Sequence, residues 1–195
     1  GPSCLTEKYL DILKENQVKA TFFLIGQQVE GNMEKVVRRQ IREGHEVGIH
    51  TYSHDAGKIY ASEEAYWQDV LKTKELLERK FYYQSKLLRF PWGSANAYIK
   101  NYKESITKQF QSQGLEYQDW NVSAEDSVGS PTADSIMRNV RKDYSRVTEP
   151  VILMHDSACN RQSLAALQGV IDELKGAGYQ FEVLSKRSKP CHFGE

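Results

Sequence analysis

The chain has 195 residues, and its 26 Lys and Arg residues balance its 26 Asp and Glu residues, so the formal net charge at pH 7 is zero with neutral histidines. That balance disfavours partners held by bulk positive charge, such as nucleic acids or anionic membrane surfaces. Hydrophobic residues make up 39% of the chain and charged residues 27%, a composition typical of a folded domain rather than a disordered segment. The length fits one compact domain, and no apolar stretch approaches the ~20 residues of a membrane span.

Short apolar segments alternate along the chain with longer amphipathic ones. Residues 5–16 place Leu10 and Leu13 on one face of a predicted helix, and the β-rich segment VKATFFLI predicts a buried strand at 18–25. In chain order, the further predictions are a helix at 32–43, a strand at 46–49, a helix at 62–79, a strand at 87–89, a helix at 98–112, a strand at 117–122, a helix at 132–144, a strand at 151–154, a helix at 163–177 and a strand at 181–184. Strands that alternate with helices predict an α/β fold with a parallel sheet, whose functional groups gather at the carboxyl ends of the strands.

Two histidines follow the predicted strand at 46–49 in the segment His-Thr-Tyr-Ser-His. His50 and His54 are four residues apart, which places both imidazoles on one side of a helical turn and within reach of one metal ion. Such a pair also occurs by chance, as two ordinary structural histidines. Its position directly after a strand favours metal binding.

A His-Asp dipeptide ends the apolar segment VILM. His155 stands at the carboxyl end of the predicted strand at 151–154, where a histidine can act as a general acid or base because its pKa lies near neutral pH. A capping or core histidine is the alternative, and Asp156 can equally cap the segment that follows.

The segment RFPWGS follows another predicted strand. Arg89 has the forked guanidinium that pairs with a carboxylate, Pro91 and Gly93 favour a tight turn, and Trp92 offers a flat apolar wall that suits a sugar ring. An ordinary turn with a buried tryptophan is the alternative. Further along, YQDWNVSAED supplies acidic side chains, among them Asp126, that can orient a histidine.

Taken together and in this order, these segments resemble the NodB-homology polysaccharide deacetylases, carbohydrate esterase family 4. The resemblance covers residues 1–185 as one domain and leaves 186–195 as a Ser- and Lys-rich tail, which we expect to be solvated. Two segments are close to the usual sequence of that family, ATFFLIG and REGHEVGIHTYSH. Its third motif is similar to RFPWGS, its fourth to DWNVSAED and its fifth to VILMHDS. The fold that the resemblance implies is a distorted, incomplete (β/α) barrel.

The resemblance also implies a role for each matching residue. His50 and His54 match two ligands of a divalent metal, zinc before cobalt. His155 matches the general acid that protonates the leaving amine, and Asp126 matches the aspartate that tunes it. Three further correspondences complete the implied site: Arg89 matches the residue that orients the catalytic base, Trp92, following Pro91, supplies a backbone N–H to the oxyanion, and Leu153 lines the pocket for the acetyl methyl group.

The sequence departs from the family at its start. The first family motif reads like TFDDGPS, with the general base and the third metal ligand as its two aspartates, and this chain opens at Gly1-Pro2-Ser3. We therefore expect the first strand and both aspartates to be missing from this chain. The expected consequences are a gap in the sheet, a metal site with only two protein ligands, and no activity of the 195 residues alone.

The implied activity is metal-dependent hydrolysis of N-acetyl groups from N-acetylglucosamine units of a cell-wall polysaccharide, peptidoglycan first and a chitin-like oligosaccharide second. Two alternatives stay open: a non-catalytic carbohydrate-binding relative of the same fold, and an O-acetyl esterase on xylan. The expected partner is the polysaccharide alone, without nucleic acid or membrane contact. We expect a monomer that works outside a bacterial cell or anchored at its surface.

Overall fold

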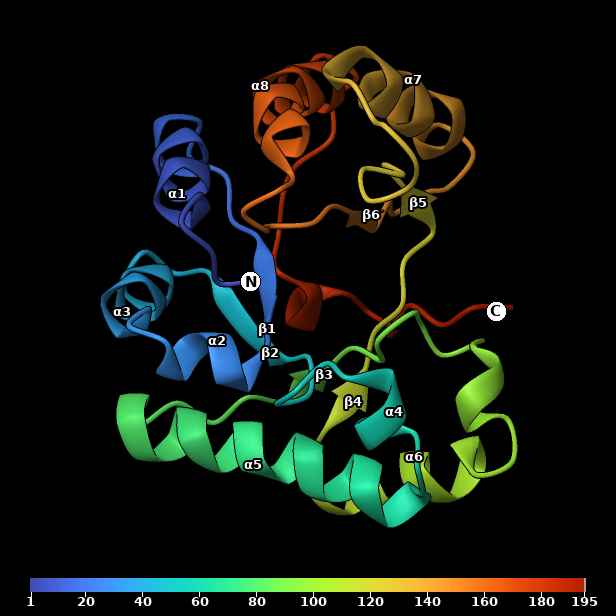
Figure 1. Ribbon diagram of the computed structural model, residues 1–195. Helices are drawn as coiled ribbons and strands as arrows, with labels where there is room; N and C mark the ends of the chain where they lie inside the picture. Colours follow the sequence, from blue (N-terminus) through green and yellow to red (C-terminus); the bar gives the residue numbers. More distant parts are fainter. Residues whose placement is uncertain (195) are drawn as a thin grey trace.

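Parallel β-sheet lies at the centre of the molecule, as described for residues 1–194 by a computed structural model (Figure 1). Within that range the larger sheet has four strands in the order β1-β2-β3-β4, and β5 pairs with β6 in a second sheet; every pairing is parallel. The strands are β1 (Thr21–Leu24), β2 (Glu46–Ile49), β3 (Leu87–Leu88), β4 (Glu116–Tyr117), β5 (Val122–Ser123) and β6 (Ile152–Leu153). The predicted α/β fold with a parallel sheet is confirmed.

Helices connect the strands and cover both sheets. They are α1 (Thr6–Glu15), α2 (Gly26–Glu30), α3 (Glu34–Arg42), α4 (Ala56–Ile59), α5 (Glu63–Phe81), α6 (Lys103–Ser112), α7 (Ala133–Tyr144) and α8 (Arg161–Gly176), with short 3-10 turns η1 (Ala97–Ile99) and η2 (Leu184–Lys186). Figure 1 shows α5 and α6 beneath the larger sheet, and α7 and α8 beside the smaller one. Helix α1 packs against both α3 and α8 and so joins the two halves. No helix within residues 1–194 is both long and apolar enough to cross a bilayer.

Two of the helices begin at side-chain caps of residue types that favour this position. The side chain of Ser62 accepts a hydrogen bond from Ala65 N at 3.0 Å at the start of α5. Thr132 and Ser135 form a reciprocal capping box at the start of α7. Each cap satisfies backbone N–H groups that the first helical turn leaves without a partner.

The buried apolar side chains fall into separate clusters. The largest lies between the four-stranded sheet and α5, and includes Leu24, Val47, Tyr66, Leu88 and Phe110. A second cluster joins β5 to α7 and α8, and a third joins α1 to α8. The molecule therefore has two main cores, one for each sheet, connected through α1.

A gap separates β1 from β6. Within residues 1–194 each of these strands pairs on one side only, β1 with β2 and β6 with β5. Both strands line a cavity of about 1190 Å³, whose walls include Phe22, Met154 and Ile171. The unpaired edges of both strands border this cavity.

Some sequence predictions are wrong in detail. Residues 181–184 form no strand; Leu184 N instead donates to Thr21 Oγ1 at 2.9 Å, which holds this segment beside the end of β1. The strand expected at 117–122 is split into β4 and β5, which belong to different sheets. The helix expected at 98–112 is divided into η1 and α6. The tail is not solvated throughout, because Cys191 is buried and its N–H donates to Gln118 Oε1 at 2.9 Å.

Candidate active site

His50 and His54 face each other directly after β2. Their ring centroids are 4.9 Å apart. The segment between them is not the helical turn that the spacing predicts. It is a tight irregular turn in which Thr51 and His54 have positive φ values of 62° and 52°. A different backbone path therefore brings the two imidazoles together.

Both imidazoles are in a state suited to binding a cation. His50 Nδ1 lies 2.8 Å from the carbonyl oxygen of Arg89, so Nδ1 acts as the donor and Nε2 keeps its lone pair. Burial, reinforced by the neighbouring His54, holds the pKa of His50 well below its usual value. Burial also lowers the pKa of His54. Neutral imidazole is the form that ligates metals.

The turn itself depends on residues that sequence reasoning missed. Asp69, on α5, accepts hydrogen bonds from Tyr52 N, from Ser53 N at 3.0 Å and from Ser53 Oγ at 2.9 Å. Gly26 N donates to the carbonyl of Thr51 at 3.1 Å. A Cβ at Gly26 would lie 2.5 Å from the ring of Tyr52, so only glycine fits there. The sequence signal was weak, since one aspartate within a long charged helix looks like a solvated face.

The histidine pair fits a metal in ligand type and falls short in number. A catalytic zinc site uses three protein ligands. Residues 1–194 contain no group of three His, Cys, Asp or Glu side chains placed to hold an ion. Asp55, next to His54, instead caps α4 by accepting from Gly57 N at 3.0 Å. The two imidazoles lie close together, and their role as metal ligands stays a prediction.

His155 and Asp126 form a closely hydrogen-bonded pair at the end of β6. The Asp126 carboxylate lies 2.7 Å from His155 Nδ1 and also accepts from His155 N at 2.7 Å and Ser163 Oγ at 2.6 Å. Burial works to raise the pKa of Asp126, but the hydrogen bonds from His155 and Ser163 outweigh it and hold that pKa below its usual value. The carboxylate fixes the tautomer of His155, whose side chain is 41% exposed. This geometry leaves Nε2 as the nitrogen that can exchange a proton with a bound molecule.

Asp156 has a structural role next to this pair. Its carboxylate accepts hydrogen bonds from Ser3 Oγ at 2.6 Å and Thr6 Oγ1 at 2.5 Å. It therefore holds the beginning of α1 against the segment after β6. The expectation that Asp156 caps the segment that follows it is wrong, because its carboxylate bonds to side chains at the start of the chain instead.

Arg89 donates to backbone carbonyls rather than to a carboxylate within the described residues. Its Nε bonds to Gln118 O and its NH2 group to Asp119 O, both at 2.9 Å. The guanidinium also lies over the ring of Phe23, with its carbon 4.2 Å from the ring centroid. Burial lowers the pKa of Arg89 to about 10, so it stays charged at neutral pH.

The loop that carries Pro91 and Trp92 is held in place from two sides. Asp119 is fully buried, and its carboxylate accepts from Ser94 N at 2.9 Å and from Phe193 N at 3.1 Å. Trp92 has a positive φ of 62° and a side chain that is half exposed, with its ring centroid 5.0 Å from that of His54. In the segment DWNVSAED the sequence indicated Asp126 as a site residue, but it did not predict that Asp119 holds this loop.

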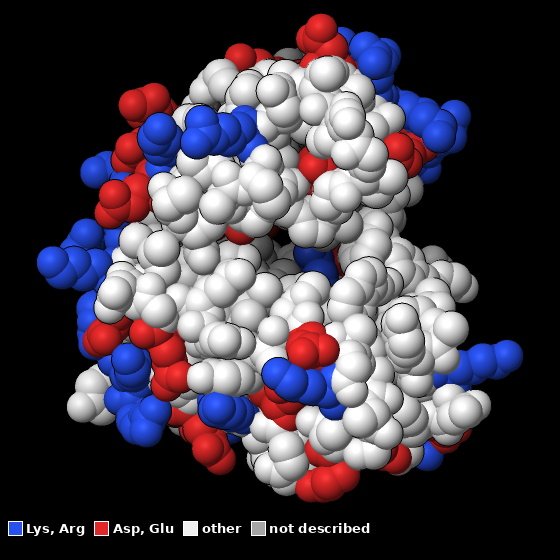
Figure 2. All heavy atoms as spheres, in the orientation of Figure 1, with Lys and Arg blue, Asp and Glu red and all other residues white. Residues whose placement is uncertain are grey.

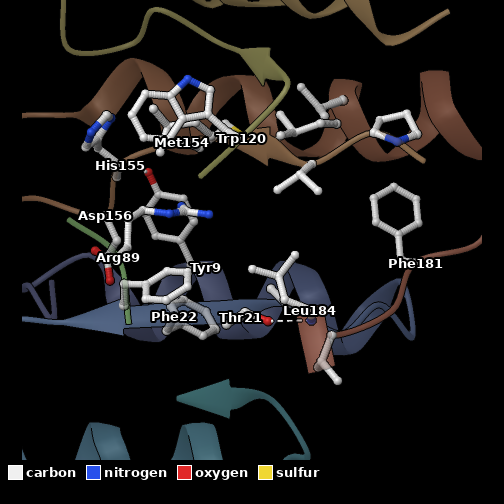
Figure 3. A pocket seen from close by; sticks show the side chains of 18 of the residues that line it. Tyr9, Thr21, Phe22, Arg89, Trp120, Met154, His155, Asp156, Phe181 and Leu184 are labelled. Carbon is white, nitrogen blue, oxygen red and sulfur yellow. Dashed lines mark hydrogen bonds between the residues drawn. The ribbon is translucent and has the colours of Figure 1, made fainter. Parts of the chain in front are cut away.

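One cavity joins these groups. His50, His54, Arg89, Trp92, Leu153 and His155 all line it. Figure 3 shows Arg89, His155 and Asp156 at one end, with Phe181 and Leu184 at the other. In Figure 2 the same face is hollowed near its centre, and most of the surface around the hollow is uncharged. Asp126 reaches this cavity only through its hydrogen bond to His155, and the residues that line the cavity come from separate motifs.

The comparisons with known proteins agree with this arrangement. A family model described as polysaccharide deacetylase matches residues 1–110. A peptidoglycan-N-acetylglucosamine deacetylase of Bacillus cereus is 30% identical over 99% of this chain and 70% of its own length. The catalytic domain of a peptidoglycan N-acetylglucosamine deacetylase from Eubacterium rectale superposes with a TM-score of 0.89 at 29% identity, covering 98% of this chain and 88% of that one. A bifunctional xylanase/deacetylase of Pseudobutyrivibrio xylanivorans is 33% identical over 95% of this chain and 29% of its own length.

Proposed function

Because this chain belongs to the polysaccharide deacetylase family, we propose that its site hydrolyses N-acetyl groups on N-acetylglucosamine units of a cell-wall polysaccharide, with peptidoglycan as the first candidate. Water adds to the acetyl carbonyl, the C–N bond breaks, and acetate and a free amine leave. The observation that carries the proposal is the hydrogen-bonded Asp126–His155 pair lining the same cavity as His50 and His54.

In this proposal His155 supplies the proton that the leaving amine needs. Asp126 holds Nδ1, so Nε2 carries the exchangeable proton toward the cavity. An amine is a poor leaving group until it is protonated, and a positioned general acid contributes about 10²- to 10⁴-fold to such a step. Leu153 lies on the cavity wall as an apolar contact for the acetyl methyl group, and the Trp92 backbone N–H is the donor for the oxyanion.

His50 and His54 would hold a divalent metal, with zinc as the first candidate and cobalt as the second. A metal held there would supply Lewis acidity toward an acyl oxygen and toward a water molecule. The chain's own contribution is two neutral imidazoles, with His50 oriented by the Arg89 carbonyl. In this proposal Arg89 orients a carboxylate base like that of the family motif before Gly-Pro-Ser.

The test compares the 195-residue chain with the same chain preceded by an Asp-Asp pair, each loaded with Zn²⁺ or Co²⁺. Acetate release is measured from peptidoglycan and from N-acetylglucosamine hexamer. We expect the extended chain to release acetate, the 195 residues alone to be inactive, and a chelator to abolish the activity. His155→Gln in the extended chain should lower kcat by about 10²- to 10⁴-fold.

The outcomes separate the competing functions. Binding of the hexamer without acetate release by the metal-loaded extended chain would contradict the hydrolase and support a carbohydrate-binding protein. Faster release from acetylated xylan than from the hexamer would support the O-acetyl esterase, which the xylanase/deacetylase relative favours. Full-rate hydrolysis by the 195 residues alone would contradict the expected need for the two aspartates.

The same proposal includes a cellular location and an oligomeric state for the protein. A cell-wall polymer is met outside the bacterial membrane, so we propose a secreted or surface-anchored protein that works as a monomer. Fractionation of the source cells and light scattering of the purified chain check these two points. A cytosolic pool alone, or a stable dimer, would contradict them.

A further inference from the structure

Four aromatic rings form a column from the core to the surface beside the candidate site. Phe90 and Tyr66 are buried, with centroids 5.5 Å apart and planes at 19°. Tyr66 stacks on Tyr60 at 5.4 Å and 5°, and Tyr60 stacks on Tyr98 at 5.0 Å and 2°. The outermost ring, Tyr98, is 58% exposed, so an aromatic surface supported by the core faces solvent.

Hydrogen bonds hold the ring of Tyr60 and the backbone of Tyr98. Tyr60 Oη donates to the Pro91 carbonyl at 2.7 Å. Asn96 Nδ2 donates to the Gly93 carbonyl at 2.6 Å, and Asn96 Oδ1 accepts from Tyr98 N at 3.0 Å. A ring already held in one orientation loses little conformational entropy when a ligand stacks on it.

The column ends next to the candidate histidines. The Trp92 ring lies 6.3 Å from that of Tyr98 and 5.0 Å from that of His54. Within residues 1–194, four large hydrophobic side chains are exposed, and Trp92 and Tyr98 are two of them. We call the exposed surface made by Trp92, Tyr98 and Tyr60 the aromatic ledge. Exposed apolar surface next to a catalytic cavity typically marks a ligand contact.

The chemistry of the ledge favours an uncharged sugar. A pyranose ring has an apolar C–H face that stacks on aromatic rings, and its hydroxyl groups stay in water. A polyanion would need cationic side chains, and the ledge has none among its three members. Resting on the proposed function, we propose that the aromatic ledge binds a second N-acetylhexosamine unit of the polymer, next to the unit whose acetyl group is removed. Tyr98 makes the outer contact, and Tyr60 is its positioning residue.

The binding test uses calorimetry with N-acetylglucosamine hexamer and the metal-free 195-residue chain, so it does not depend on hydrolysis. Tyr98→Ala should weaken binding by roughly two- to tenfold, the range expected for one aromatic stacking contact. Tyr98→Phe, which keeps the ring, should restore most of the affinity. Tyr82→Ala is the matched control, because Tyr82 is 92% exposed at the far end of α5, roughly 28 Å along that helix. Equal affinities of the wild type and Tyr98→Ala, or no binding by the wild type, would overturn the proposal.

A kinetic measurement distinguishes sugar binding by the aromatic ledge from the hydrolytic step. In the extended chain the ratio of kcat/KM for the hexamer to kcat/KM for the disaccharide should fall in Tyr98→Ala, with the loss mainly in KM. A chain that binds the hexamer through Tyr98 but releases no acetate would overturn the proposed function and leave the ledge supported. If the extended chain releases acetate and Tyr98→Ala leaves its preference for long chains unchanged, the proposed role of the aromatic ledge is overturned and the proposed function is not.

Discussion

At the candidate general acid, one carboxylate satisfies three donors at once. Asp126 is 2% exposed and accepts from His155 N, His155 Nδ1 and Ser163 Oγ. An asparagine at this position would offer one oxygen and bring N–H donors toward other donors. Because buried donors without partners cost about 1–3 kcal/mol, this residue matters for stability as well as for chemistry.

We therefore predict that Asp126→Asn lowers the free energy of unfolding at pH 7 by about 1–3 kcal/mol in urea titrations. Ser163→Ala removes a single donor and serves as the control, with a smaller loss. The folded-state pKa of Asp126 is depressed, so its stabilisation is complete above the unfolded pKa near 4 and is lost as the pH falls through the folded value. A difference between wild type and Asp126→Asn that did not shrink at acid pH would contradict this account.

His45 also makes folding stability fall on acidification, in a pH window that begins higher, near the unfolded pKa of a histidine. It is buried, its Nδ1 accepts from Ala20 N at 3.2 Å, and its Nε2 has no partner among the described residues. Burial, together with nearby Lys19, lowers its pKa to about 4. Between pH 6.5 and about 4 the unfolded chain binds a proton at this side chain that the folded chain does not. Folding stability therefore falls as the pH falls through that window.

His45→Gln removes this titration and should flatten the dependence of unfolding free energy on pH. The slope between pH 6 and 4.5 should decrease by up to about 1.4 kcal/mol per pH unit, the limit for one proton. His50 and His54 have lowered pKa values as well, so part of the slope should remain. Urea titrations at several pH values measure it, and an unchanged slope would show that His45 protonates equally in both states.

At the scale of elements, residues 191–193 behave as part of the active-site scaffold. Asp119 N donates to the Cys191 carbonyl at 2.7 Å, and the Asp119 carboxylate accepts from Phe193 N. The Phe193 ring packs edge-on against Trp120 with centroids 4.7 Å apart, and it lies where a side chain at Gly93 would have to go. The tail thus supports the loop that carries Trp92.

Phe193→Ala should consequently loosen that loop. We expect faster amide hydrogen exchange across residues 90–96 and a loss of about 1–2 kcal/mol in unfolding free energy, from lost apolar burial and the aromatic pair. Val128→Ala, at a 67% exposed position, is the control and should change stability by less than about 0.5 kcal/mol. Unchanged amide hydrogen exchange in residues 90–96 would show that Phe193 does not support this loop.

The long elements could be predicted from the sequence because their signals are local. The helices predicted at 62–79 and 132–144 match α5 and α7 to within a few residues. Residues 181–184 have the alternation of a strand, but a strand also needs a neighbouring strand to pair with, and this segment is held instead by Thr21. The strand expected at 117–122 breaks because the carbonyls of Gln118 and Asp119 bind Arg89 where the chain crosses between sheets.

The candidate site was predictable for a related reason. Functional side chains gather at the carboxyl ends of parallel strands, and the histidines after β2 and β6 line one cavity although the two strands belong to different sheets. Asp69 and Asp119 were missed because they act from an adjacent helix and from a crossing segment, through bonds that no local pattern encodes.

On the scale of the whole molecule, the two main cores are unequal and a cavity lies between them. The cluster around the four-stranded sheet includes many fully buried side chains, whereas the cluster of β5, α7 and α8 is smaller and borders the cavity. Local stability follows the buried apolar contacts of each region. We predict that amides of α7, residues 133–144, exchange at a lower opening free energy than those of α5, residues 63–81. Native-state hydrogen exchange measures this, and equal values would mean that the molecule opens as one unit.

The gap between β1 and β6 also affects how the protein behaves toward small apolar molecules. Its cavity of about 1190 Å³ is reached from solvent and lined by side chains such as Phe22, Met154 and Phe181. Environment-sensitive dyes such as ANS become fluorescent on apolar surface of this kind, and their binding is commonly taken as a sign of a loosened, molten state. We therefore expect such dyes to fluoresce with a fully native sample of this protein at room temperature. A dye-based melting curve would then begin from a high fluorescence baseline.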